Sequence, residues 1–248
     1  MTTATAHPVR HVEHCMGTVF SVDVRSPGVA MSAIVDVVAW LHHVDATFST
    51  YRPDSVISAL GRGEIALRDC PAEVREVMQR CDDIAAETHG YFSARAGGDL
   101  DPSGYVKGWA IERASDILCA AGSVNHCVNG GGDVQCVGSA APDRPWRVGI
   151  AHPLRVGELA AQVQGSGRFA VATSGSAERG AHITDPHAGR RPTALASVTV
   201  IGVDLADVDA YATAAFAMGN DAAAWLGSRD DLQALLIDPD GRQSSSTT

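Results

Sequence analysis

Residues 124–137 read VNHCVNGGGDVQCV, and this stretch carries most of the information about the fold class. Two β-rich runs, Val124–Asn129 and Val134–Val137, flank a run of glycines. Glycine accepts the positive backbone φ angles that a tight hairpin turn needs, so the stretch predicts two antiparallel strands. The same glycines also suit close approach of a ligand to the backbone, and the sequence leaves both roles open. No helix follows them, which disfavours a Rossmann nucleotide site.

The pattern outside this hairpin separates helices from strands along the chain. Alternating or β-rich runs predict further strands at 18–24, 146–151, 159–164, 169–173, 197–203 and 233–237. Helical spacing of apolar residues, with capping residues at the ends, predicts helices at 30–48, 55–60, 71–88, 106–120, 207–218 and 222–226. Because strands and helices do not alternate regularly, we expect an α+β fold with a largely antiparallel β framework and flanking helices. We expect one domain over 1–248, with flexible ends at 1–13 and 244–248.

Composition narrows the class of function. The 248 residues include 19 Lys+Arg and 29 Asp+Glu, a net charge of −10, and no basic cluster, so the sequence argues against nucleic-acid binding. No run approaches the roughly 18–20 apolar residues of a membrane-spanning helix, and no export signal is evident, so we expect a cytoplasmic protein. The six cysteines lack zinc-finger spacing, and reduced, buried thiols are favoured over a zinc site.

The segment Asp101–Gly108, with sequence DPSGYVKG, combines a turn with the start of a helix. Amide groups at a helix N-terminus attract anions, and Lys107 stands one turn in, so the segment suits a phosphate group. It does not match the P-loop pattern. A capped helix start with a solvated lysine explains the local sequence equally.

Two nearby segments, Thr173–Ser176 and His182–Pro186, carry hydroxyl, imidazole and carboxylate groups. They invite comparison with a hydrolase triad, but the G-x-S-x-G motif is absent and spacing alone does not establish such a triad. His182 is a candidate general base because an unperturbed imidazole titrates near pH ~6.5. A histidine that merely fixes the loop is the alternative.

Asp209 and Thr213 are four residues apart in a predicted helix, so their oxygens project from one face. A carboxylate and a hydroxyl suit a hard cation such as Mg²⁺, which often takes its remaining ligands from water and substrate phosphates. An aspartate that stabilises the helix start through the dipole is the alternative.

The order and spacing of these segments resemble the ApbE family, the FAD:protein FMN transferases, over nearly the whole chain. The matching segments are Met16–Thr18, Phe48–Tyr51, Asp54–Ser55, Gly90–Phe92, Asp101–Ala110, Asn129–Asp133, Thr173–Gly175, His182–Gly189 and Asp209–Thr213. The resemblance implies an α+β fold and Mg²⁺-dependent transfer of FMN from FAD to a Thr or Ser hydroxyl of an acceptor protein, with release of AMP.

The resemblance also implies roles for individual residues. His182 falls at the family's proposed base. Metal ligands are implied at Asp209, Thr213 and the backbone carbonyl of Gly104. Contacts to FAD are implied at Met16, Tyr51, Tyr91, Phe92, Ser93, Asp101, Lys107, His182 and Ile183. Two positions depart from the family pattern: Ser93 stands where many members have Asp, and His187 replaces a more usual basic residue.

Three alternatives stay open at this point. An FAD pyrophosphatase would use the same site with water as acceptor and give FMN and AMP. A non-catalytic FAD-binding protein would leave FAD intact. An interaction module that keeps only the fold would bind no flavin.

Overall fold

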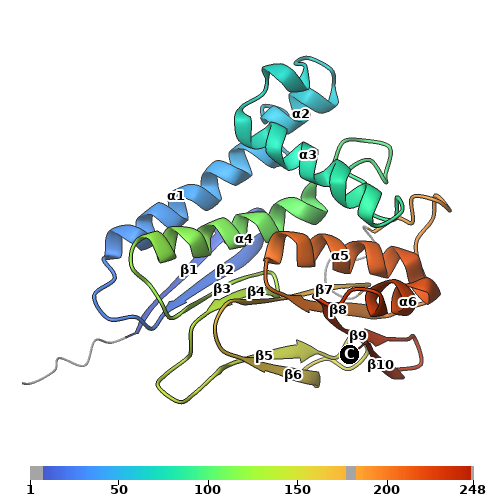
Figure 1. Ribbon diagram of the computed structural model, residues 1–248. Helices are drawn as coiled ribbons and strands as arrows, with labels where there is room; N and C mark the ends of the chain where they lie inside the picture. The colour runs from blue at the N-terminus through green and yellow to red at the C-terminus, as the bar shows by residue number, and fades with distance from the viewer. Residues whose placement is uncertain (1–7, 177–182, 247–248) are drawn as a thin grey trace, which may run out of the picture.

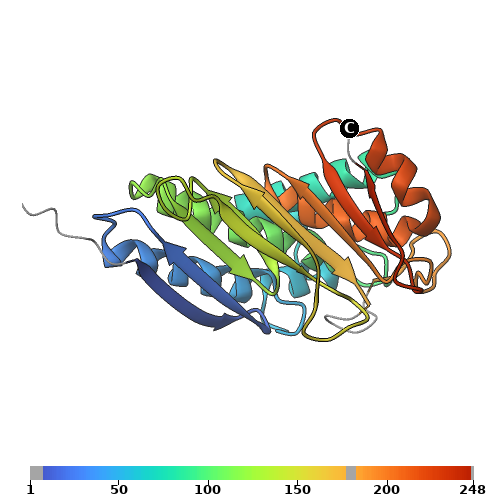
Figure 2. The same ribbon diagram turned by 90° about the horizontal axis from the view of Figure 1, so that it is seen from below.

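The computed structural model describes residues 8–176 and 183–246 of the chain. Its main feature is an eight-stranded sheet in the order β1-β2-β3-β4-β7-β8-β9-β10, in which every neighbouring pair is antiparallel. The strands of this sheet are β1 (Val9–Cys15), β2 (Thr18–Val24), β3 (His126–Gly130), β4 (Asp133–Val137), β7 (Phe169–Gly175), β8 (Ser197–Gly202), β9 (Gln233–Ile237) and β10 (Gln243–Ser246). Figure 2 shows them side by side from one edge of the sheet to the other.

The helices lie on one face of this sheet. The α-helices are α1 (Met31–Phe48), α2 (Val56–Gly61), α3 (Ala72–Glu87), α4 (Ser103–Ala120), α5 (Leu205–Met218) and α6 (Ala222–Gly227), with 3₁₀ turns η1 (Leu67–Asp69) and η2 (Gly219–Asp221). Helices α1, α4 and α5 cover the sheet directly, and α2 and α3 lie further out (Figure 1). The expected α+β class with an antiparallel framework is therefore confirmed.

A separate hairpin covers the other face of the sheet. Strands β5 (Trp146–Ala151) and β6 (Leu159–Gly165) pair only with each other and lie below the sheet in Figure 1. Trp146 and Val148 pack there against Val134, Cys136 and Val171 of the sheet. This second apolar cluster explains why the residues of β4 are buried on both faces at its centre.

The glycine run forms the hairpin turn that the sequence predicts. Gly131 and Gly132 connect β3 to β4 and have φ angles of 59° and 96°, which residues with a Cβ rarely adopt. Their turn also touches the neighbouring strand, because the Gly131 N–H donates to the carbonyl of Val19 at 3.2 Å. The turn thereby fixes one end of the sheet, next to the start of β4.

The described residues near both ends of the chain form strands that the sequence analysis did not predict as such, and the flexibility of the ends stays a prediction. Residues 9–13 belong to β1, which pairs along its length with β2, and residues 244–246 belong to β10, which pairs with β9. Each terminal strand lies at a sheet edge and satisfies its backbone hydrogen bonds on one side only. The sequence pattern missed β1 because an edge strand needs few apolar residues.

Helix α4 begins earlier than the sequence predicts. The expected start was Val106, whereas the helix begins at Ser103. The carboxylate of Asp101 accepts the N–H of Ser103 at 3.0 Å and so stabilises the first turn.

Within the described residues, no helix is both long enough and apolar enough to cross a bilayer.

Candidate functional site

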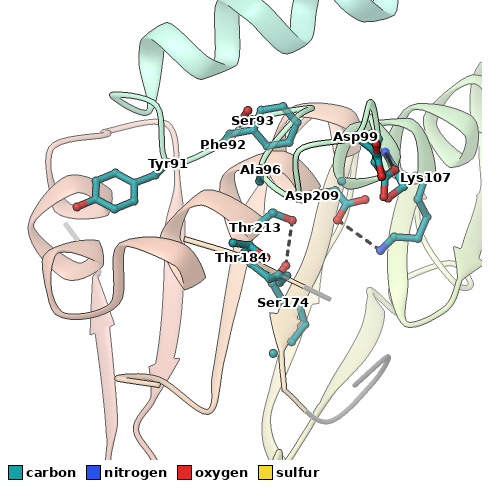
Figure 3. Close-up of a pocket in the computed structure, with 17 residues that line it drawn as sticks. Tyr91, Phe92, Ser93, Ala96, Asp99, Lys107, Ser174, Thr184, Asp209 and Thr213 are labelled. Atoms are coloured by element: carbon teal, nitrogen blue, oxygen red, sulfur yellow. Dashed lines mark hydrogen bonds and ion pairs between the residues drawn. The ribbon is translucent and has the colours of Figure 1, made fainter. Parts of the chain in front are cut away.

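A cavity of about 300 Å³ lies where α4, α5 and the end of β7 meet the segments 91–104 and 183–184. Figure 3 shows Asp209 near its centre, with Lys107 on one side, Thr213 and Ser174 on another, and Phe92 and Ser93 above. The lining residues are Tyr91, Phe92, Ser93, Ala96, Gly97, Asp99, Asp101, Ser103, Gly104, Lys107, Thr173, Ser174, Gly175, Ile183, Thr184, Asp209 and Thr213.

Helix α5 contributes two oxygen-bearing side chains to the cavity. Asp209 and Thr213 are one turn apart on the same face, as the sequence predicts, and Asp209 is only 2% exposed. The hydroxyl oxygens of Thr213 and Ser174 lie 3.3 Å apart, within hydrogen-bonding distance. A carboxylate and two hydroxyls from a helix and a strand therefore converge at one point.

Helix α4 approaches these groups with its first two turns. An added Cβ at Gly104 would lie 3.6 Å from the Thr213 hydroxyl oxygen and 3.3 Å from the ring of Phe92. Gly104 is therefore close to Thr213, and its small size leaves room between the two helices.

Lys107 links two buried carboxylates. Its ammonium nitrogen forms an ion pair with Asp133 and lies 3.3 Å from Oδ1 of Asp209. Asp133 is fully buried, and its other oxygen accepts the N–H of Thr173 at 3.0 Å. Oδ2 of Asp209 accepts the N–H of Gly108 at 3.0 Å. Paired and hydrogen-bonded in this way, the charges are held in fixed positions at the edge of the cavity.

Nine of the residues expected at the site line this cavity, two described ones do not, and one lies outside the described residues. Those that line it are Tyr91, Phe92, Ser93, Asp101, Gly104, Lys107, Ile183, Asp209 and Thr213. Met16 lies in the two-residue turn between β1 and β2 and lines a separate hollow with His42 and Asp45. Tyr51 follows α1 and is 96% exposed. His182 lies outside the described residues.

The sequence interpretation gave no role to Asp133 and considered Ser174 only as the hydroxyl of a hydrolase triad. Both stand in segments that it quoted, but only the tertiary structure brings Asp133 to Lys107 and Ser174 to Thr213. The sequence did contain one signal for the lysine partner of Asp133. Lys107 is the only lysine among the 19 basic residues, and it follows a turn.

The hydrolase-triad alternative finds no contact among the described residues of its members. Ser174 faces Thr213, and the Asp185 carboxylate accepts the N–H groups of His187 and Ala188 at 2.8 and 3.2 Å. Asp185 therefore shapes its own loop.

The oxygen donors around Asp209 fit a hard cation. Among the described residues, no group of three His, Cys, Asp or Glu side chains has the geometry of a metal site, so a metal here would need other ligand types. Thr213 and Ser174 supply hydroxyl oxygens beside the Asp209 carboxylate. Mg²⁺ prefers such oxygen ligands and commonly completes its shell with water and phosphate oxygens. The donor set is therefore compatible with Mg²⁺.

Comparison with known proteins gives consistent matches. The ApbE family model matches residues 16–98 and 93–236. The FAD:protein FMN transferase of Rhodobacter capsulatus is 31% identical over 227 residues, which cover 88% of this chain and 40% of that protein. The enzyme of the same name from Treponema pallidum is 31% identical over 212 residues, 78% of this chain and 56% of that protein. The chain thus spans about half the length of the curated relatives it matches.

Solved structures match the fold over nearly the whole chain. The ApbE protein of Thermotoga maritima has a TM-score of 0.86 at 20% identity, covering 97% of each chain. The apo form of the flavinyl transferase ApbE of Pseudomonas stutzeri has a TM-score of 0.84 at 23% identity, covering 100% of this chain and 97% of that one. Sequence and fold comparisons agree, and the chain belongs to the ApbE family.

Proposed function

We propose that this chain transfers FMN from FAD to a Thr or Ser hydroxyl of an acceptor protein in a Mg²⁺-dependent reaction that releases AMP. The observation that supports this most is the convergence of the buried Asp209 carboxylate, the Thr213 hydroxyl and the Lys107 ammonium on one cavity. A pyrophosphate needs a metal and a cation of this kind in a protein whose net charge is −10. The relatives named FAD:protein FMN transferase agree with this chemistry.

In this proposal Asp209, Thr213 and the carbonyl of Gly104 hold Mg²⁺. When bound, Mg²⁺ offsets the charge on the pyrophosphate oxygens and lowers the cost of attack on phosphorus. Lys107 would hold a fixed positive charge beside the phosphates, oriented by its two carboxylate partners. Positioning and electrostatics of this kind supply most of the rate enhancement in phosphoryl transfer.

The remaining residues would orient the dinucleotide. A cavity of about 300 Å³ is at the lower end for small-molecule sites, so FAD would extend beyond it. Tyr91, Phe92, Ser93, Asp101 and Ile183 would contact the enclosed part. Met16 and Tyr51 would contact a part of FAD outside the cavity.

The bond changes of the proposed reaction are simple. The acceptor hydroxyl oxygen bonds to the phosphorus of the FMN half, and the bond from that phosphorus to the bridging oxygen breaks. AMP leaves with the bridging oxygen, and the hydroxyl proton passes to a base. We assign the base to His182, following the family resemblance.

A cytoplasmic location stays part of the proposal, to be checked by cell fractionation.

Incubation with FAD, Mg²⁺ and a protein carrying a short Ser/Thr flavinylation motif tests the proposal. We expect fluorescent labelled acceptor after denaturing electrophoresis, equimolar AMP, and loss of both products with a chelator. AMP without labelled acceptor would instead indicate a pyrophosphatase. FAD bound but intact would indicate a binding protein.

The base assignment has its own test. Because general-base catalysis contributes about 10²–10⁴-fold, His182→Ala should lose that factor in the transfer rate and keep its affinity for FAD. Wild-type rates in this variant would remove His182 from the mechanism.

A further inference from the structure

We propose that His187 is a positioning residue that ties the loop 183–190 to the segment 89–91 and so holds together two walls of the FAD cavity. This inference rests on the proposed function. It also gives a role to one of the two residues at which the chain departs from the family pattern.

The imidazole of His187 contacts three consecutive residues of the other segment. Its Nε2 lies 3.0 Å from the carbonyl oxygen of His89, which is 98 positions away in the chain. Its ring meets the ring of Tyr91 edge to face, with centroids 4.5 Å apart and planes at 68°. A Cβ added to Gly90 would lie 3.3 Å from Cε1 of His187. The contact therefore combines a hydrogen bond with close packing against Gly90 and Tyr91.

Each of the two joined segments supplies part of the cavity wall. Tyr91 and the two residues after it line the cavity from one side, and Ile183 and Thr184 line it from the other. The hydrogen bond to His89 and the ring contact with Tyr91 join the loop of His187 to the first of these two walls. A change in this contact would alter the distance between the walls and hence the fit of the ligand.

Hydrogen bonds within the loop also hold the backbone around His187 in a turn. The carboxylate of Asp185 accepts the N–H groups of His187 and Ala188. The N–H of Asp185 donates to the carbonyl of Arg190 at 2.9 Å, and that of Gly189 donates to the carbonyl of Asp185 at 2.8 Å. The imidazole is thus presented from a closed turn, which lowers the entropy cost of the contact.

The opposite partner is also fixed in place. Helix α3 ends at Glu87, and His89 has a φ of 52°, a value uncommon for residues with a Cβ. The hydroxyl of Thr88 accepts the N–H of Phe92 at 3.1 Å. This turn leaves the His89 carbonyl available to a donor on the loop.

The chemistry of the contact requires an N–H group and not a charge. A carbonyl oxygen only accepts, so Nε2 of His187 must carry its proton, as it does in one neutral tautomer and in the imidazolium. A glutamine amide also supplies an N–H donor, whereas phenylalanine supplies only the ring. Substitution can therefore separate the contributions of the N–H donor, the aromatic ring and the charge.

The test compares His187→Ala, His187→Gln and His187→Phe with the control His43→Ala. His43 is an exposed histidine on α1 that pairs with Glu73 and lies against the Trp40 ring. Flavin fluorescence gives the Kd for FAD, and the transfer assay gives KM and kcat. We expect His187→Ala to raise both Kd and KM about 5–30-fold, the effect of losing one or two contacts, with kcat within about threefold of wild type. We expect His187→Gln to recover most of this loss, His187→Phe to recover less, and the control to match wild type.

Unchanged Kd and KM in His187→Ala, or no recovery in His187→Gln when both variants melt at the wild-type temperature, would overturn the inference. Failure of the proposed function looks different, because the wild-type protein itself would then give no labelled acceptor. The Kd measurements would still test the role of His187 in FAD binding.

Discussion

Asp209 on α5 contacts α4 through both oxygens of its carboxylate. One carboxylate oxygen accepts the N–H of Gly108 on α4, and the other faces Lys107. Asp207 stands two residues earlier on the same helix, but its carboxylate makes a two-point contact with Arg80 on a different side. Two aspartates of one helix therefore serve different purposes, and this difference supplies a matched experiment.

Asp209→Asn should lose most of its transfer activity, by a factor of at least about 10², because the amide is a poorer ligand for Mg²⁺ and no longer balances Lys107. Asp207→Asn should keep the wild-type rate and Mg²⁺ dependence. The measurement is transfer rate against Mg²⁺ concentration for both variants. Equal magnesium titrations in Asp209→Asn and wild type would remove Asp209 from the metal site.

His126 is a buried titratable residue away from the cavity. It lies in β3 with no exposed surface, and its ring nitrogens are 2.8 Å from the Ser115 hydroxyl and 3.0 Å from the Ser123 hydroxyl. Burial, which disfavours the charged imidazolium, lowers the pKa of His126 to about 4. The native protein therefore holds this imidazole neutral at pH values where an unfolded chain would protonate it.

The stability of the protein should fall with acidity because of His126. In the unfolded chain the imidazole binds a proton near pH ~6.5, so between that pH and about 4 the unfolded state binds more protons than the native state. The free energy of unfolding should then decrease by up to about 1.4 kcal/mol per pH unit as the pH falls through this range. Above it, His126 should contribute no slope.

Urea unfolding at pH 4.5, 5.5 and 7.5 measures this effect, with His126→Gln as the comparison. Other acidic groups titrate in both proteins, so the difference between their pH slopes isolates His126. Parallel slopes would mean that the native state accommodates the protonated ring.

At the scale of elements, the contact between α4 and α5 sets the geometry of the site. A Cβ on Gly108 would lie 2.6 Å from the backbone oxygen of Leu205 and 2.8 Å from the Cβ of Asp209. The two helices therefore touch through their backbones at the level of the Asp209 carboxylate. A glycine is required at this crossing because of the close approach and not because of its φ angle.

Gly108→Ala should push the helices apart, at a cost of about 1–3 kcal/mol in the free energy of unfolding and with a large loss of transfer activity. Gly227→Ala is the control, since a Cβ there meets no atom within 4 Å, and it should change stability by less than about 1 kcal/mol. Chemical unfolding and the transfer assay give the two readouts. A Gly108→Ala protein of wild-type stability and activity would show that the crossing tolerates expansion.

Elements with strong local patterns were predictable from the sequence. β2 has the predicted bounds Thr18–Val24, because Phe20, Val22 and Val24 alternate toward the core. β1 was missed, since it is an edge strand with few apolar residues. The early start of α4 depends on one side-chain hydrogen bond from Asp101.

The site was predictable to the extent that its residues share an element or a family motif. Asp209 and Thr213 follow from helical spacing, and the structure brings them to one cavity. The partnership of Lys107 with Asp133 was not predictable, because it joins a helix to a hairpin turn 26 positions later. Tyr51 was predicted from a family motif alone, and in the structure it lies exposed and outside the cavity.

At the scale of the whole molecule, the two faces of one sheet pack into two separate apolar clusters. The larger cluster joins the sheet to α1, α3, α4 and α5, and the smaller joins it to the β5–β6 hairpin. The cavity lies on the helical side, where Thr173, Ser174 and Gly175 end β7. The hairpin therefore supports β4 and β7 from behind, so the strand that carries Asp133 has packed residues on both faces.

The scarcity of lysine has a practical consequence for the whole chain. Lys107 bears the only side-chain amine and is 15% exposed in the cavity. Once acylation of the α-amino group is separated by peptide mapping, a reagent that acylates amines therefore reports on that one location. We expect slow modification of Lys107 in the free protein and still slower modification when FAD and Mg²⁺ are present, followed by intact-mass and peptide mass spectrometry. An equal modification rate with and without FAD would mean that the dinucleotide does not bind beside Lys107. The unmodified natural sequence thus contains its own site-specific occupancy probe.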